Sequence, residues 1–171
     1  MPDTGFSVSD AQLERFAACY ERAPDKSLSL QDDPETSRYR STPVAPSGAG
    51  GLVGTVSDYA NFCEMLLQKG KFRGKQIIGR PILELMTSNH LGDQSLAQMA
   101  VGGFSETNND GVGFGLGFAT TMDAVATGTV GEGDFYWGGL ASTLFWVDPI
   151  EDIYAIFMTQ LIPSSLSLIH I

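Results

Sequence analysis

The sequence Trp137-Gly138-Gly139 places an aromatic residue and two glycines between two apolar stretches. Glycine has no side chain, so a ligand can come close to the backbone, and backbone N–H groups can stabilise an oxyanion that develops there. A structural role is the alternative, with Trp137 as a strand residue before a glycine bulge. The local pattern alone favours the structural role, and only the flanking matches described below favour the functional one.

Other candidate groups carry less weight. His90 follows a short predicted helix and is expected to lie on the surface or to cap that helix, and His170 lies in the C-terminal tail. The alternating glycines from Gly111 to Gly117 lack the following helix that a nucleotide-binding loop requires. Cys, His and carboxylate residues nowhere show the spacing of metal ligands. The sequence therefore predicts no metal and no cofactor.

The composition is that of one globular domain or part of one. The 171 residues are 43% hydrophobic and 18% charged, with a net charge of −10. The acidic residues are scattered and the ten Lys and Arg form no basic stripe, which argues against nucleic acid or an anionic membrane as a partner. We expect no membrane span and see no signal peptide, so the localisation stays unassigned.

Apolar periodicity predicts three helices. The first begins at a capping box on Ser9 and should bury one face before Pro24, namely Leu13, Phe16, Ala17 and Tyr20. The clearest spans residues 55–70, with a stripe of Tyr59, Phe62, Cys63, Leu66 and Leu67. The third begins near Pro81, with an inner face of Ile82, Leu85 and Met86. Cys19 and Cys63 fall on apolar helix faces, so both are interpreted as core residues.

The rest of the chain favours strands and loops. Short strands are expected around residues 27–30 and 38–40, and a loop over residues 92–110. Gly111 to Phe118 alternates glycine with apolar residues, a strand pattern whose bare face lets another element or a ligand come close. Further strands are expected over residues 134–137, 143–147 and 153–160. Helices for parallel crossovers between them are lacking, so the sequence predicts an antiparallel meander.

Five segments in this order resemble the C-terminal part of the serine β-lactamase-like hydrolases. This family includes class C β-lactamases, penicillin-binding-protein relatives and family VIII-type carboxylesterases. The matching segments are Met1–Phe6, Gly50-Gly51-Leu52 together with Ser57-Asp58-Tyr59-Ala60, Gly113–Phe118, Trp137-Gly138-Gly139, and Val147-Asp148-Pro149 together with Met158-Thr159-Gln160. The resemblance implies an α+β fold, an antiparallel sheet flanked by helices. It covers residues 1–163 and leaves residues 164–171 as a tail of uncertain origin.

The resemblance also implies a site. Trp137-Gly138-Gly139 resembles the family's third motif, and the backbone N–H of the next residue, Leu140, would be one of two oxyanion donors. Trp137 would form the wall on the acyl or leaving-group side of the pocket, and Gly138 and Gly139 would leave room for a small-molecule ester or lactam. Lactamases carry Lys where Trp137 stands, so the cation that would meet a β-lactam carboxylate is missing and esters are favoured.

The sequence departs from the family at the nucleophile. The family uses a Ser-x-x-Lys motif, but Ala23, Leu66, Gln68 and Phe72 stand three positions before the four lysines. The family places this motif upstream of the matching segment. Tyr59-Ala60-Asn61 has the letters of the family's second motif, but Tyr59 belongs to the apolar stripe and is interpreted as core.

Two functional hypotheses follow. In the first, the chain is a portion of a serine hydrolase that forms an acyl-enzyme, and it is inactive alone. In the second, it is a non-catalytic truncated or binding protein that retains the fold. In either case an unpaired sheet edge is expected to favour self-association.

Overall fold

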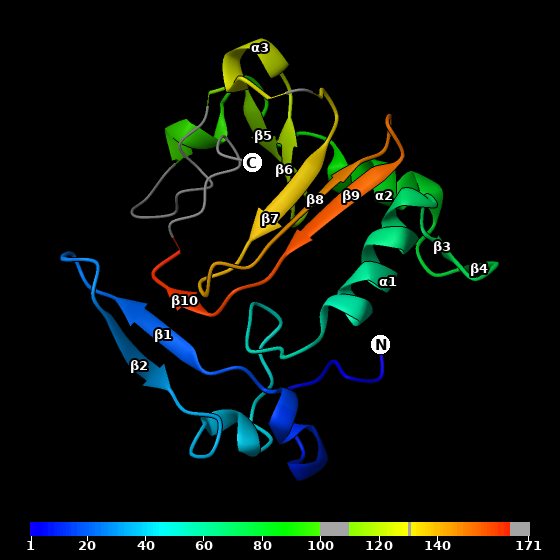
Figure 1. The fold of residues 1–171 in the computed structure, drawn as a ribbon. Coiled ribbons are helices and arrows are strands. Elements are labelled where there is room, and N and C mark those ends of the chain that lie inside the picture. The colour runs from blue at the N-terminus through cyan, green and yellow to red at the C-terminus, as the bar shows by residue number, and fades with distance from the viewer. Residues whose placement is uncertain (100–109, 130, 165–171) are drawn as a thin grey trace.

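The computed structural model describes residues 1–99, 110–129 and 131–164, and Figure 1 shows their arrangement. The described strands form a five-stranded sheet in the order β5-β6-β7-β8-β9, a three-stranded sheet in the order β10-β1-β2, and a hairpin of β3 and β4. Helix α1 (Val56–Leu67) packs against the five-stranded sheet. The predicted α+β class, an antiparallel sheet flanked by helices, is confirmed.

The five-stranded sheet is an antiparallel meander, as predicted, but it contains one strand, β6, that the sequence pattern did not predict. Its strands are β5 (Val112–Phe114), β6 (Ala119–Thr121), β7 (Phe135–Gly138), β8 (Leu144–Asp148) and β9 (Ile153–Phe157). Each pairs with the next along the chain, and Trp137 on β7 lies opposite Phe145 on β8. The short helix α3 (Ala124–Thr127) lies between β6 and β7 and is capped by Asp123.

Helix α1 buries its apolar stripe against β7 and β8. Cys63 and Leu66 from the helix share one core cluster with Phe135, Phe145 and Val147 from the sheet. The Thr55 hydroxyl caps the helix by accepting from the Asp58 N–H at 3.2 Å. The predicted helix and the core position of Cys63 are therefore confirmed.

A second core cluster contains Leu96, Val112, Ala119 and Tyr136. The bare glycine face of the predicted strand is filled by the protein itself: a Cβ on Gly115 would collide with the Met86 carbonyl, at the end of helix α2 (Arg80–Thr87). The pattern allowed either another element or a ligand to come close to this strand face, and the end of helix α2 is the neighbour that does so at Gly115. The strand is shorter than predicted, because the chain turns at Gly117 (φ 108°) into β6.

The first predicted helix is wrong over most of its length. Asp10–Arg15 forms a 3₁₀ turn (η1) with the predicted Ser9 capping box, and Cys19–Arg22 then forms strand β1. Strand β1 pairs with β2 (Leu28–Asp32) and, in parallel, with β10 (Leu161–Ile162). These tertiary pairings override the helical periodicity, and Tyr20 and Cys19 lie on a strand; Cys19 is nevertheless buried.

Two smaller expectations also differ. Arg38–Arg40 is a 3₁₀ turn (η2) rather than a strand, because the Ser37 hydroxyl accepts from the Tyr39 N–H and closes the turn. Leu83 is the buried residue of α2, whereas Ile82 and Leu85 of the predicted inner face are about half exposed. The remaining elements are η3 (Leu96–Met99), β3 (Lys71–Phe72) and β4 (Lys75–Gln76).

The predicted division into residues 1–163 and a tail stays a prediction, and residues 165–171 of that tail, with His170, lie outside the described residues. Within the described ranges, no helix is long and apolar enough to cross a membrane.

Candidate active site

The residues predicted from the third motif lie at the end of β7 and in the turn that joins it to β8. Residues 139–142 form a β-turn, closed by the Ser142 N–H donating to the Gly139 carbonyl at 3.0 Å. The Gly139 N–H donates to the Thr143 carbonyl at 2.8 Å, and Ser142 adopts a left-handed conformation with φ of 59°. This is a type I turn followed by a left-handed bulge residue, a common connection of three residues between antiparallel strands.

Leu140 occupies the second position of this turn. Its side chain is 66% exposed, and no described residue accepts a hydrogen bond from its backbone N–H. Leu140 is not among the residues with positive φ, as a type I turn requires at that position. The N–H groups of Leu140 and Ala141 both have no acceptor among the described residues, and the turn holds them in a fixed local geometry, which is the property an oxyanion donor needs. Of the two, Leu140 is the donor that the resemblance indicates.

Trp137 and Gly139 have structural roles in addition to any functional one. The half-buried Trp137 ring meets the Phe114 ring edge to face, with centroids 5.0 Å apart. A Cβ on Gly139 would collide with the Thr143 hydroxyl, so a larger residue at this position would have to displace the Thr143 side chain. Gly138 ends β7 opposite Leu144. The structural interpretation of the motif is thus correct in part, and it is compatible with the functional one.

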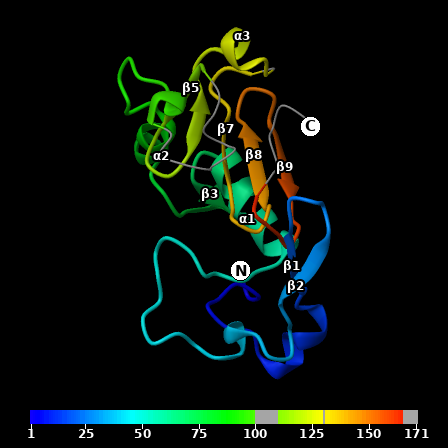
Figure 2. The same cartoon turned by 90° about the vertical axis from the view of Figure 1, so that its left-hand side faces the viewer.

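The turn lies beside β10, where the five-stranded sheet meets the three-stranded one, as Figure 1 shows and Figure 2 shows from the side. The Ser142 hydroxyl donates to the Leu161 carbonyl at 2.8 Å. The Thr159 hydroxyl lies 2.9 Å from the Ser142 carbonyl oxygen and 3.2 Å from that of Ala141. Ser142 and Thr159 are the residues of this region that sequence reasoning missed, since nothing in their spacing indicates that their hydroxyls meet backbone carbonyls.

Comparison with known proteins identifies the family of this chain. The family model described as Beta-lactamase matches residues 1–165. The chain belongs to the β-lactamase family. Two curated relatives from Mycobacterium tuberculosis, the uncharacterised protein MT1414 and protein Rv1367c, are each 30% identical over 167 residues. The match covers 95% of this chain and 40% of each relative, so the chain spans about two fifths of their length.

Solved structures share the fold. EstCE1, described as a hydrolase with promiscuous acyltransferase activity, has a TM-score of 0.76 and 25% identity over 95% of this chain and 43% of its own. Simvastatin synthase (LovD) from Aspergillus terreus, unliganded, has a TM-score of 0.72, 19% identity, and coverage of 95% and 42%. A penicillin-binding-protein homologue from Caulobacter crescentus has a TM-score of 0.60, 12% identity, and coverage of 94% and 43%.

Tyr59 lies in the core, as predicted, although it carries the letters of the family's second motif. It packs between helix α1 and the sheet, within the cluster that contains Phe62 and Phe145. Burial raises the pKa of its phenol to about 12, so the hydroxyl does not ionise near neutral pH. Burial likewise raises the pKa of the Cys63 thiol to about 12, which fits an inert core cysteine.

The remaining polar candidates have structural partners. His90 is exposed, and its Nε2 lies 2.8 Å from the Leu85 carbonyl near the end of α2, which fits the predicted capping role. In the described ranges, no three His, Cys, Asp or Glu side chains gather in a way that could hold a metal ion.

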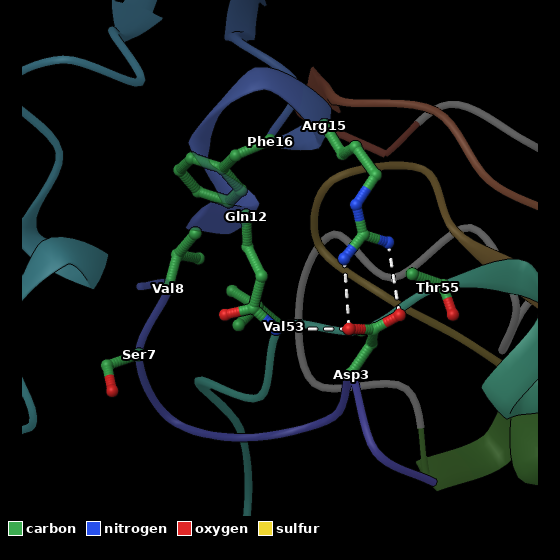
Figure 3. Close-up of a pocket in the computed structure, with 9 residues that line it drawn as sticks. Asp3, Ser7, Val8, Gln12, Arg15, Phe16, Val53 and Thr55 are labelled. Atoms are coloured by element: carbon green, nitrogen blue, oxygen red, sulfur yellow. Dashed lines mark hydrogen bonds and ion pairs between the residues drawn. The ribbon is translucent and has the colours of Figure 1, made fainter. Parts of the chain in front are cut away.

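The pocket in Figure 3 lies between the N-terminal segment and residues 53–55, and residues 137–140 do not line it. The Arg15 guanidinium binds the Asp3 carboxylate through two bonds of 2.9 and 3.0 Å, and Gln12 donates to the same carboxylate. These hydrogen bonds, from Arg15 above all, lower the pKa of Asp3. The ion pair of Arg15 and Asp3 joins η1 to the start of the chain. The charged groups that line the pocket therefore already bind each other.

Proposed function

We propose that this chain supplies part of the active site of a serine hydrolase that acts on small esters through an acyl-enzyme. Its contribution is the Leu140 N–H, which would be one of two donors to the tetrahedral oxyanion. The observation that carries the proposal is this free N–H in an exposed, hydrogen-bonded turn directly after Trp137-Gly138-Gly139. Membership of the β-lactamase family supports it, and so does the fold shared with the hydrolase EstCE1.

In this reaction a serine attacks the ester carbonyl, the alcohol leaves, and water then hydrolyses the acyl-enzyme. The negative charge on the carbonyl oxygen is largest in the tetrahedral intermediates, so a fixed N–H stabilises these states more than the bound ester. One such donor contributes about 3 kcal/mol to the transition state. The chain needs no cofactor for this role.

The proposed substrate class is a neutral ester rather than a β-lactam antibiotic. Trp137 offers an aromatic wall where a lysine would bind the antibiotic's carboxylate. The ring is held against Phe114, so the wall of the site is rigid and apolar. A lactam and a peptide are assayed beside the esters as competing substrates.

The absence of Ser-x-x-Lys from the 171 residues favours a second candidate, a non-catalytic protein that retains the fold. Sequencing the encoding locus on both sides separates the two. An open reading frame that extends upstream into Ser-x-x-Lys supports the enzyme, whereas a start codon with regulatory sequence at Met1 supports the second candidate.

The activity is tested with a fluorophosphonate probe on two proteins, the chain alone and the full-length gene product, here called the parent protein. We expect the parent protein to be labelled on one serine and to hydrolyse p-nitrophenyl esters faster than a chromogenic cephalosporin. The chain alone should be neither labelled nor active. A parent protein that takes no label and hydrolyses no ester would contradict the proposal, and stoichiometric labelling of the chain alone would contradict its predicted inactivity.

A further inference from the structure

The backbone carbonyls of Ala141 and Ser142 in the turn accept hydrogen bonds from residues 159–161, the segment that follows β9 in the chain. The Thr159 hydroxyl lies within hydrogen-bond distance of two successive carbonyl oxygens, at 3.2 Å from Ala141 and 2.9 Å from Ser142. The Ala141 carbonyl also accepts from the Leu161 N–H at 3.1 Å. The Ala141–Ser142 and Ser142–Thr143 peptide groups, which lie two and three peptide groups after the one that carries the Leu140 N–H, are therefore fixed from outside the turn.

The turn also donates one hydrogen bond to the same segment. The Ser142 side chain is buried, and its hydroxyl donates to the Leu161 carbonyl at 2.8 Å. Ser142 is also the residue with positive φ, so this bond holds the chain in the conformation that completes the turn. Turn and segment thus restrain each other through side-chain and backbone bonds.

The segment is in turn fixed by the N-terminal part of the chain. The Tyr20 N–H donates to the Gln160 carbonyl at 2.9 Å, and Tyr20 lies beside Leu161 in the parallel pairing of β1 and β10. Residues 159–161 therefore lie between β1 and the turn. Leu140 itself is exposed, and its own N–H has no partner among the described residues. That N–H shares a peptide group with the Gly139 carbonyl, which accepts from the Ser142 N–H, so the bonds that hold Ser142 act on the donor through this turn bond.

We propose that Thr159 and Ser142 are positioning residues that aim the Leu140 N–H at the substrate oxygen; the inference rests on the function proposed above. A donor stabilises an oxyanion fully only if it is fixed before the charge develops. A misplacement of about 1 Å can cost about 100-fold in rate. Neither hydroxyl is placed to contact substrate, because both are occupied by backbone carbonyls of the turn and β10.

The test uses three threonine variants of equal or similar size. Thr159→Val removes the hydroxyl with little change in shape, and Thr159→Ser retains it. Thr87→Val is the matched control, because the Thr87 hydroxyl also lies near a backbone carbonyl, that of Leu83 at 3.1 Å, but within helix α2. Ser142→Gly provides a second route if Thr159→Val fails to fold, since glycine tolerates the positive φ while the bond to Leu161 is lost.

The first readout is the Leu140 amide in the ¹⁵N-labelled parent protein. We expect an order parameter near the value of about 0.85 typical of rigid backbone in the wild type, Thr159→Ser and Thr87→Val. In Thr159→Val or Ser142→Gly it should fall toward the value of about 0.6 that marks a flexible backbone.

The second readout is ester hydrolysis by the parent protein. Thr159→Val should lower kcat by about 10- to 100-fold with KM nearly unchanged, and Thr159→Ser should restore it. A normal kcat in Thr159→Val would overturn the inference, and so would a lower kcat without any change at the Leu140 amide. If deleting the Leu140 donor itself leaves kcat unchanged, the proposed function fails first; if only the Thr159 variants are silent, the positioning role alone fails.

Discussion

The Tyr59 ring lies against the Phe145 ring, with centroids 5.3 Å apart and planes tilted by 55°. This contact joins helix α1 to strand β8 in the larger core cluster. The letters of Tyr59-Ala60-Asn61 resemble a catalytic motif, but the packing of Tyr59 is that of a core residue.

We therefore predict that Tyr59→Phe leaves the ester hydrolysis of the parent protein near wild type, because the ring contacts remain. Tyr59→Ala should instead lower the free energy of unfolding by about 3 kcal/mol, through the cavity left in the core. Urea unfolding and ester assays measure the two effects. A folded Tyr59→Phe variant without turnover would assign Tyr59 a catalytic role and contradict this interpretation.

The buried Asp134 should make stability depend on pH. Burial raises the pKa of its carboxyl group, although the Trp146 indole N–H, 2.6 Å away, and the neighbouring Thr121 act in the opposite direction. The folded state then holds this proton more tightly than the unfolded chain, so the stabilisation is present at low pH and is lost as pH rises through the folded-state pKa.

Asp134→Asn removes this titration while keeping an oxygen for the Trp146 N–H. We expect the difference in melting temperature between this variant and the wild type to shift in favour of the variant as pH rises from 4 to 7. Asp93→Asn, at an exposed position, is the control and should show no such trend. A difference that is constant with pH would show that Asp134 has the same pKa in both states.

Self-association of the isolated chain is expected at strand β9. Within the described residues β9 pairs only with β8, and Ile153, Tyr154 and Phe157 expose roughly two fifths to a half of their side chains. An edge strand with apolar side chains is a template for pairing with another copy, and lysine on such an edge opposes it.

Tyr154→Lys should therefore shift the chain toward monomer in sedimentation velocity. Val125→Lys adds the same charge on α3, away from this edge, and should change the distribution little. We also expect the wild-type chain to be marginally stable. A monodisperse wild-type monomer with a sharp, cooperative melt would contradict both expectations.

The sequence predicted those elements that local patterns determine. Helix α1 has five apolar residues at helical spacing and a threonine cap, and the meander strands follow one another with short connections. Strand β1 was missed because the residues up to Tyr20 also fit a helical apolar periodicity, which the pairings of β1 with β2 and with the distant β10 override. The inner face of α2 was wrong because an eight-residue helix offers too few apolar positions to fix its orientation.

The site was predictable only in part for the same reason. Trp137-Gly138-Gly139 is visible as a motif, and the resemblance indicates Leu140 as the donor. The Thr143 hydroxyl lies where a Cβ at position 139 would be, and the Thr159 hydroxyl that bonds to the turn lies two strands further along the chain, after β9. These are contacts between side chains and backbone groups that the fold brings together, so residue types and spacing do not reveal them.

The central claim concerns one backbone N–H, and Leu140→Pro in the parent protein tests it most directly. Proline suits the second position of a type I turn, so this change deletes the donor while the turn is retained. Leu140→Ala keeps the N–H and is the control for loss of the exposed side chain. We predict that Leu140→Pro lowers kcat for ester hydrolysis by about 10²–10³-fold with Leu140→Ala close to wild type. A folded Leu140→Pro variant with near-normal kcat would show that Leu140 is not an oxyanion donor.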